Sequence, residues 1–302
     1  MSNIDGEREA IPRILELFQL YGIHATWATV GMLMCKNYAH WRDIRPTIMP
    51  EYSRPQCSTY QLGASIQEYP HLFFGRALAE QILDTPGQEI ASHSYSHFYC
   101  GETGATPEQF AADLVCAREV AAELGVNYRS FVFPRNQVQD SYLEVLTEFG
   151  YRVYRGNPKN WLYSNGHMVA GGVVGRGIRL ADAYVPLSGP NLARPTPRAG
   201  LINCPASAFL RPWSQRRSAL EPLRMRRIKQ AMLAAAQAGE NFHLWWHPHN
   251  FGENIEENLA VLESILQYYS VLSHQYGMQS LTMAEVASAS ETVSEASRTL
   301  LC

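Results

Sequence analysis

Segments with the pattern of β-strands alternate with segments with the pattern of helices along this 302-residue chain, most regularly in its first half. Apolar residues spaced three or four apart indicate helices, and short apolar or Thr-rich runs indicate strands. Helix ends are marked by Thr106-Pro107 before one helix and by a glycine after each. We predict helix 7–21, strand 24–31, a strand that runs into a loop over 88–97, helix 107–124, strand 130–134, helix 140–149 capped by Asp140, and strand 151–155.

This alternation favours an α/β fold in which helices cover a parallel sheet. The second half is less regular and contains a Pro-rich loop over 188–200. Because the chain shows no repeat and no sharp change in composition, we expect one domain over 1–286 and a disordered tail over 287–302. The elements predicted for the second half are strand 201–210, a basic helix over 211–230, strand 241–246, helix 255–272 and a strand-like segment over 277–283.

Composition excludes several classes of protein. Hydrophobic residues make up 46% of the chain and charged residues 18%, which is typical of a globular protein rather than a disordered one. The net charge of −3 gives no reason to expect nucleic acid as a partner, and no apolar run is long enough to span a membrane. The six cysteines are scattered without a CxxC pair, and the N-terminus is acidic, so we expect reduced thiols and a cytoplasmic location.

Five of the ten histidines fall in two short windows, each where a predicted strand gives way to a loop. The windows are His93-Ser-Tyr-Ser-His97 and His243-Leu-Trp-Trp-His247-Pro-His249. In parallel α/β folds, ligands bind at that end of the strands. Because neutral imidazole binds divalent metals, His93 and His97 could hold one ion if their rings converge. The alternative is that both rings bond to the backbone or to each other.

His247 and Arg135 are two further candidates. Period-two alternation places His243, Trp245 and His247 on one face of a strand, with His247 at its end. A histidine there suits a general acid, and the alternative is a core histidine bonded to a backbone carbonyl. Arg135 follows another strand, where it could orient a carboxylate through a bidentate contact or could simply lie on the surface.

In this order, these windows resemble the motifs of the polysaccharide deacetylases, the carbohydrate esterases with NodB homology. The resemblance runs from about residue 7 to about residue 286. HSYSH resembles the family's His-x-x-x-His metal pair, and YGIHATWATVG resembles its second strand. FPRNQ followed by EFGYRVYRG resembles the third motif with its next strand, and LWWHPHNF resembles the strand that ends in the catalytic histidine.

The resemblance implies a distorted (β/α) barrel that removes acetyl groups from N-acetylated, or O-acetylated, sugars or polysaccharide precursors. It implies a divalent metal, usually zinc, held by two histidines and an aspartate, with a second aspartate as the base. Carried over, His93 and His97 are the metal ligands and His247 is the acid. Arg135 is the candidate for the family's arginine, although that arginine usually stands two residues before the proline, where this chain has Val132.

The family's first motif, a strand ending in Asp-Asp-Gly, has no full counterpart. The chain begins Met-Ser-Asn-Ile-Asp-Gly, so Asp5 could stand at the ligand position, with Ile4 where the base should be. Alternatively, residues 1–10 lead into the first helix and the first strand is missing or shortened. A barrel without that strand exposes two sheet edges, so we also expect the chain to form homo-oligomers.

Three hypotheses follow from the sequence. The first is a metal-dependent sugar deacetylase, and the second is a pseudoenzyme or carbohydrate-binding protein that lacks the catalytic aspartate. The third is an unrelated metal hydrolase on a similar barrel. Metal content and acetate release separate the first two, and activity on phosphoesters or peptides would indicate the third.

Overall fold

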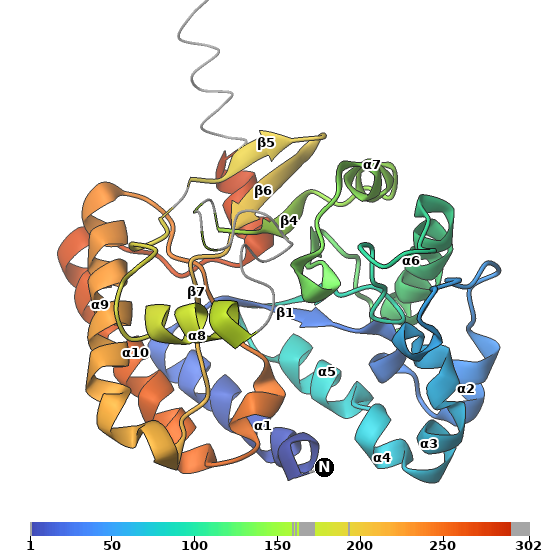
Figure 1. The fold of residues 1–302 in the computed structure, drawn as a ribbon, viewed down its shortest axis with the longest axis horizontal. Coiled ribbons are helices and arrows are strands. Elements are labelled where there is room, and N and C mark those ends of the chain that lie inside the picture. The colour runs from blue at the N-terminus through green and yellow to red at the C-terminus, as the bar shows by residue number, and fades with distance from the viewer. Residues whose placement is uncertain (1, 159, 161, 163–172, 193, 291–302) are drawn as a thin grey trace, which may run out of the picture. The chain divides into compact units, whose positions relative to one another are not determined.

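The computed structural model describes residues 2–158, 160, 162, 173–192 and 194–290, and Figure 1 shows their fold. The chain divides into two compact units. The first, here called the sheet unit, comprises His24–Arg155, Thr196–Cys204 and Leu281–Cys302. The second, here called the helical unit, comprises Met1–Ile23, Gly156–Pro195 and Pro205–Ser280.

The sheet unit is built on a six-stranded sheet with the strand order β1-β2-β3-β4-β6-β5. The first four strands are parallel, and β5 runs antiparallel to β6. The mainly parallel sheet predicted from the alternation is therefore confirmed. The carboxyl ends of the parallel strands meet at one edge of the sheet, which positions the loops that follow them. The strands are β1 (Ala25–Thr29), β2 (Gln88–Ser92), β3 (Ser130–Phe131), β4 (Val153–Gly156), β5 (Thr196–Arg198) and β6 (Leu201–Pro205).

Two predicted helices of the sheet unit are present. Helix α6 (Pro107–Ala122) begins with a capping box in which the Thr106 side chain accepts from the Gln109 backbone and the Gln109 side chain accepts from the Thr106 backbone. Helix α7 (Asp140–Glu148) has Gln139 at its N-cap, so Asp140 is its first residue rather than its cap. The other short helices of this unit are η1 (Gly31–Met34), α2 (Tyr38–Asp43), η2 (Pro55–Cys57), η3 (Thr59–Leu62), α3 (Gly63–Glu68), α4 (Pro70–Phe73), α5 (Arg76–Asp84) and η4 (Pro134–Asn136).

The prediction of a strand over 277–283 is wrong. Residues 277–282 are irregular, and a helix runs from 283 to 290. Thr282 and Glu285 form a reciprocal cap, because the Glu285 carboxylate accepts from the Thr282 backbone and the Thr282 hydroxyl accepts from the Glu285 backbone. The expected tail over 287–302 thus begins with helical residues, and 291–302 lie outside the described residues.

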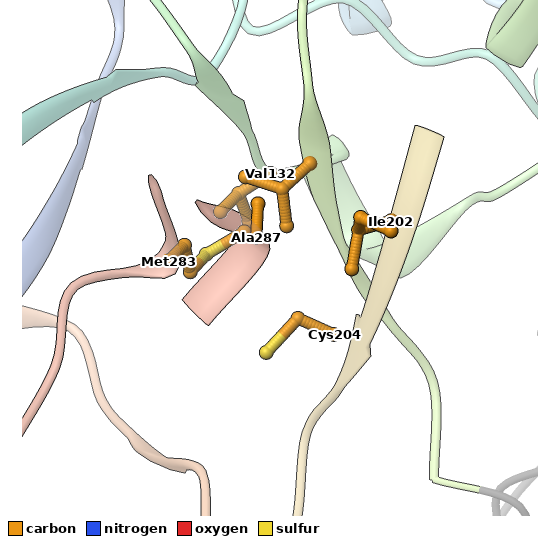
Figure 2. Close-up of a cluster of buried hydrophobic side chains, with 6 residues drawn as sticks. Val132, Ile202, Cys204, Met283 and Ala287 are labelled. Atoms are coloured by element: carbon orange, nitrogen blue, oxygen red, sulfur yellow. The ribbon is translucent and has the colours of Figure 1, made fainter. Parts of the chain in front are cut away.

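A small buried cluster explains why this last segment is helical (Figure 2). Met283 and Ala287 stand four residues apart, so they lie on one face of the helix. Figure 2 shows both side chains turned toward the sheet, near Val132, Ile202 and Cys204. Of the apolar residues that suggested a strand, Met283 is buried in this cluster, whereas Leu281 is exposed.

The helical unit consists mainly of long helices, with α10 packed against both α1 and α9. The prediction of a helix over 211–230 is partly wrong, because residues 211–214 are irregular and the α-helix begins only at Glu221. Pro222 near the start of that helix fits its first turn, where no backbone N–H is needed. The elements are α1 (Ser2–Tyr21), α8 (Val173–Asp182), β7 (Ala208–Phe209), η5 (Gln215–Leu220), α9 (Glu221–Ala238), β8 (Leu244–Trp245), η6 (Pro248–Phe251) and α10 (Ile255–Tyr276).

The structure bears on two further expectations. Within the described ranges, no helix combines the length and the apolar character needed to cross a bilayer. Five of the six cysteines lie in those ranges, where they are buried and form no disulfide. The sixth, Cys302, lies outside them.

Candidate active site

The loops that follow β2 and β3 lie side by side at the carboxyl edge of the sheet. Ser92, the last residue of β2, is in register with Phe131, the last residue of β3. Beyond that pair, the Val132 backbone N–H donates to the Ser92 carbonyl at 3.0 Å. His93 therefore leaves β2 at the same level at which the segment containing Arg135 leaves β3.

The two imidazoles of the first histidine window come together. The ring centroids of His93 and His97 are 4.8 Å apart, and the ring planes are inclined by 67°. The Nδ1 atom of His93 lies 2.6 Å from the Val132 carbonyl oxygen. Because a carbonyl can only accept, this nitrogen carries the proton, which leaves a lone pair on Nε2. A ring oriented in this way is typical of a histidine that binds a metal through Nε2.

The backbone of this loop is held in an unusual conformation. Ser94 and His97 have φ values of 61° and 58°, in the left-handed region that non-glycine residues rarely adopt. Ser94, Tyr95 and Ser96 are buried, while the two histidines are partly exposed. Such strain persists only where surrounding contacts over-determine the conformation, and it is frequent at functional sites.

Arg135 lies beside the same loop. Its guanidinium carbon is 3.9 Å from the centroid of the Tyr99 ring, and that ring is 5.0 Å from the ring of His97. The Arg135 Nη1 atom donates to the Glu102 carboxylate at 3.0 Å, and Arg54 pairs with the same carboxylate. The neighbouring Arg54 and Arg135 guanidinium groups hold the pKa of Glu102 below its ordinary value. Arg135 thus binds a carboxylate of this chain, and its predicted contact with a substrate stays a prediction.

Sequence reasoning missed several polar residues of this edge. Arg155, near the end of β4, donates to the Asn136 side chain at 2.8 Å, and burial lowers the pKa of Arg155 to about 10. Asp113 of α6 is fully buried and contacts the loop 93–97, here called the histidine loop. Desolvation raises the pKa of Asp113 to about 6, against the opposing effect of its hydrogen-bond donors. The charge at a strand end could have indicated Arg155, whereas Asp113 looks in sequence like any helical carboxylate.

His247 belongs to the helical unit. It lies two residues after the end of β8 and is the N-cap residue of η6. Its ring lies 5.5 Å from that of Trp245 and 5.9 Å from that of Phe209, while His249 stacks on it at 5.2 Å. The contact with Trp245 agrees with the alternation predicted for this strand. Because His247 is exposed, it is not the buried core histidine of the alternative interpretation.

The donor set for a metal is incomplete within the described residues. No cluster of three or more His, Cys, Asp or Glu side chains there has the arrangement of a metal site. The convergence of His93 and His97 and the fixed tautomer of His93 fit two ligands of a divalent ion. Asp5 does not end a strand: it is an exposed residue in the first turn of α1 and belongs to the helical unit.

Comparisons with known proteins agree with this fold. A crystal structure described as "putative polysaccharide deacetylase from Mycobacterium smegmatis" matches 96% of this chain and 79% of its own, with a TM-score of 0.58 and 15% identity. A GH57-type branching enzyme from the hyperthermophilic archaeon Pyrococcus horikoshii matches 93% of this chain and 64% of its own, with a TM-score of 0.51 and 10% identity. At such identities these likenesses show the fold alone.

Sequence comparison is more specific. The chain matches no curated protein sequence. The family model of polysaccharide deacetylases matches residues 5–154, which include the histidine pair, Arg135, the strands β1 to β3 and the start of β4. The chain therefore belongs to the polysaccharide deacetylase family.

Proposed function

We propose that this chain is a metal-dependent hydrolase that removes acetyl groups from N-acetylated, or O-acetylated, sugars or polysaccharide precursors. Family membership supports a deacetylase-type hydrolase, and the specific reaction is our proposal. The observation that carries it is the pair of imidazoles, 4.8 Å apart, in the loop after β2.

His93 and His97 are the residues that would hold the cation, which we propose to be zinc because imidazole suits it. When bound, the cation supplies Lewis acidity to the acetyl carbonyl. The Val132 carbonyl keeps the proton of His93 on Nδ1, which leaves the lone pair of Nε2 for the cation. His247 is the proposed proton donor to the leaving group, a role for which an exposed imidazole is suited.

The test combines metal content with acetate release. The purified protein is dialysed against zinc, its metal is quantified, and acetate is measured with N-acetylglucosamine oligosaccharides as the probe. We expect about one zinc per chain and acetate release, and we expect His93→Ala and His97→Ala each to abolish both. His274→Ala, which removes an exposed histidine from the last turn of α10, is the matched control.

Two outcomes contradict the proposal in different ways. Bound zinc without acetate release from any acetylated sugar would favour the pseudoenzyme. Stoichiometric zinc in both His93→Ala and His97→Ala would show that the ligand assignment is wrong.

We also propose a cytoplasmic site of action, in keeping with five buried cysteines that form no disulfide.

A further inference from the structure

A fully buried carboxylate accepts hydrogen bonds from the middle of the histidine loop. Asp113, on α6, accepts hydrogen bonds from the Tyr95 backbone at 2.6 Å, from the Ser96 backbone at 3.1 Å and from the Ser96 hydroxyl. Both carboxylate oxygens are used. The donors are the residues between the two histidines, and Asp113 itself has no exposed surface.

The loop needs such a partner because of its backbone conformation. The residues with positive φ, Ser94 and His97, flank the two residues whose N–H groups Asp113 binds. Non-glycine residues adopt this conformation only when other interactions outweigh its cost. Hydrogen bonds to an ionised acceptor are about twice as strong as neutral ones, so the Asp113 carboxylate is a strong restraint on this turn.

The carbonyl groups of the same turn are held from other directions. The Gly31 and Met32 backbones donate to the carbonyls of residues 94 and 95 at 2.8 and 2.9 Å, and the Thr59 hydroxyl donates to that of Ser96 at 3.0 Å. The backbone N–H groups of residues 95 and 96 are therefore bound by Asp113, and the carbonyl groups of residues 94 to 96 are bound by other segments. The side chains at its two ends are His93 and His97, so the conformation of the turn determines how far apart the two rings lie.

We infer that Asp113 is a positioning residue that holds His93 and His97 at the spacing needed to bind one cation. The inference rests on the proposed function, in which these two imidazoles are the ligands. An amide cannot replace the carboxylate, because its NH₂ group would face a backbone N–H where a second acceptor is needed. Partners that orient metal ligands typically account for 10- to 100-fold in metal affinity, and we expect Asp113→Asn to weaken zinc binding by that factor.

Calorimetric titration of the full chain with zinc tests this expectation. Glu119→Gln makes the same change in charge at an exposed position of the same helix. Leu114→Ala removes a fully buried side chain next to Asp113 and so lowers stability without touching the loop's hydrogen bonds. We expect both controls to bind zinc within twofold of the parent chain. Asp113→Asn binding within twofold of the parent, or Leu114→Ala losing as much affinity as Asp113→Asn, would overturn the inference.

Ser96→Ala keeps the test decisive should Asp113→Asn not fold, because it removes only the hydroxyl donor. We expect a smaller loss of zinc affinity, about threefold or more. Imidazole ¹⁵N NMR of the metal-free protein gives a second readout, since Val132 fixes the proton on Nδ1 of His93. We expect Ser96→Ala to shift the His93 and His97 resonances and Glu119→Gln to leave them unchanged. If the parent chain binds no zinc, the proposed function fails, whereas unshifted resonances in Ser96→Ala refute the positioning role.

Discussion

Two glycines bring α1 and η6 of the helical unit into direct backbone contact. A Cβ atom added to Gly252 would lie 2.1 Å from the Asn3 carbonyl oxygen and 2.9 Å from the Glu7 nitrogen. A Cβ atom added to Gly6 would lie 2.0 Å from the Gly252 carbonyl oxygen. These neighbours are backbone atoms, so no side chain can swing aside. Gly252→Ala would therefore have to move η6 away from α1 by roughly 1 Å.

The expected losses of stability and activity in Gly252→Ala follow from this displacement. Overpacking of this kind costs about 1–3 kcal/mol, so we expect the free energy of unfolding of Gly252→Ala to fall by about 2 kcal/mol. Because η6 begins directly after His247, the same shift moves the proposed proton donor. A displacement of about 1 Å can cost 100-fold in rate, and we expect acetate release to fall by about 10- to 100-fold.

Urea unfolding followed by circular dichroism, together with the acetate assay, measures both effects. Gly177→Ala is the matched control, because Gly177 lies in α8 of the same unit with no neighbour within 4 Å of an added Cβ. Alanine is the better helix former, so this control should gain about 0.5–1 kcal/mol. If Gly252→Ala is as stable and as active as the parent chain, the close contact between α1 and η6 has no energetic importance.

Three further predictions concern the sheet unit. Phe110→Ala removes a fully buried ring that packs against four other aromatic rings, and should lower the urea-unfolding free energy by about 3–5 kcal/mol, against less than about 0.5 kcal/mol for exposed Val115→Ala. The arginine partners of Glu102 lower its pKa, so the ionised carboxylate stabilises the folded state, by less than about 1 kcal/mol. This stabilisation is present above pH 4.5 and is lost as the pH falls through the lower folded-state pKa. The difference in unfolding free energy between the parent chain and Glu102→Gln should therefore vanish in acid. Strand β1 is at the edge of the sheet and, within the described residues, pairs only with β2, so we expect the chain to self-associate through this edge. Ala28 is exposed on β1, and a lysine there (Ala28→Lys) should weaken the association. A parent chain that is monomeric by light scattering contradicts this expectation.

The fold of the sheet unit was largely predictable because its signals are local. The capping box at Thr106 and the short apolar strands each depend on a few neighbouring residues, and each is present in the structure. The segment 31–87 was not predictable in the same way, since its helices are short and depend on tertiary packing rather than on propensity. At residues 277–283 the apolar residues led to the prediction of a strand, whereas the structure has a Thr-x-x-Glu helix cap at Thr282 and Glu285, a local signal that the prediction did not use.

The candidate site was predictable only in part. The His93–His97 pair was found because its residue types and spacing carry a chemical meaning that is independent of the fold. The contacts that support it join residues far apart in the chain, such as Arg135 with Glu102 and Asp113 with Tyr95. Nothing local distinguishes Asp113 or Glu102 from a solvent-exposed acid, so only their tertiary contacts reveal their roles.

Backbone strain connects the two loops of the site. Among the described residues of the sheet unit, the non-glycine residues with positive φ are Ser94, His97, Arg135, Asn136 and Ala199. The first four lie in the loops that follow β2 and β3, where glycine would adopt this conformation at less cost. Glycine has no side chain, however, and three of these four positions present an imidazole, a guanidinium or an amide to the site. The side chains needed there explain why the chain accepts strain, and they make these loops the least predictable part of the unit from local preference and the most informative about function.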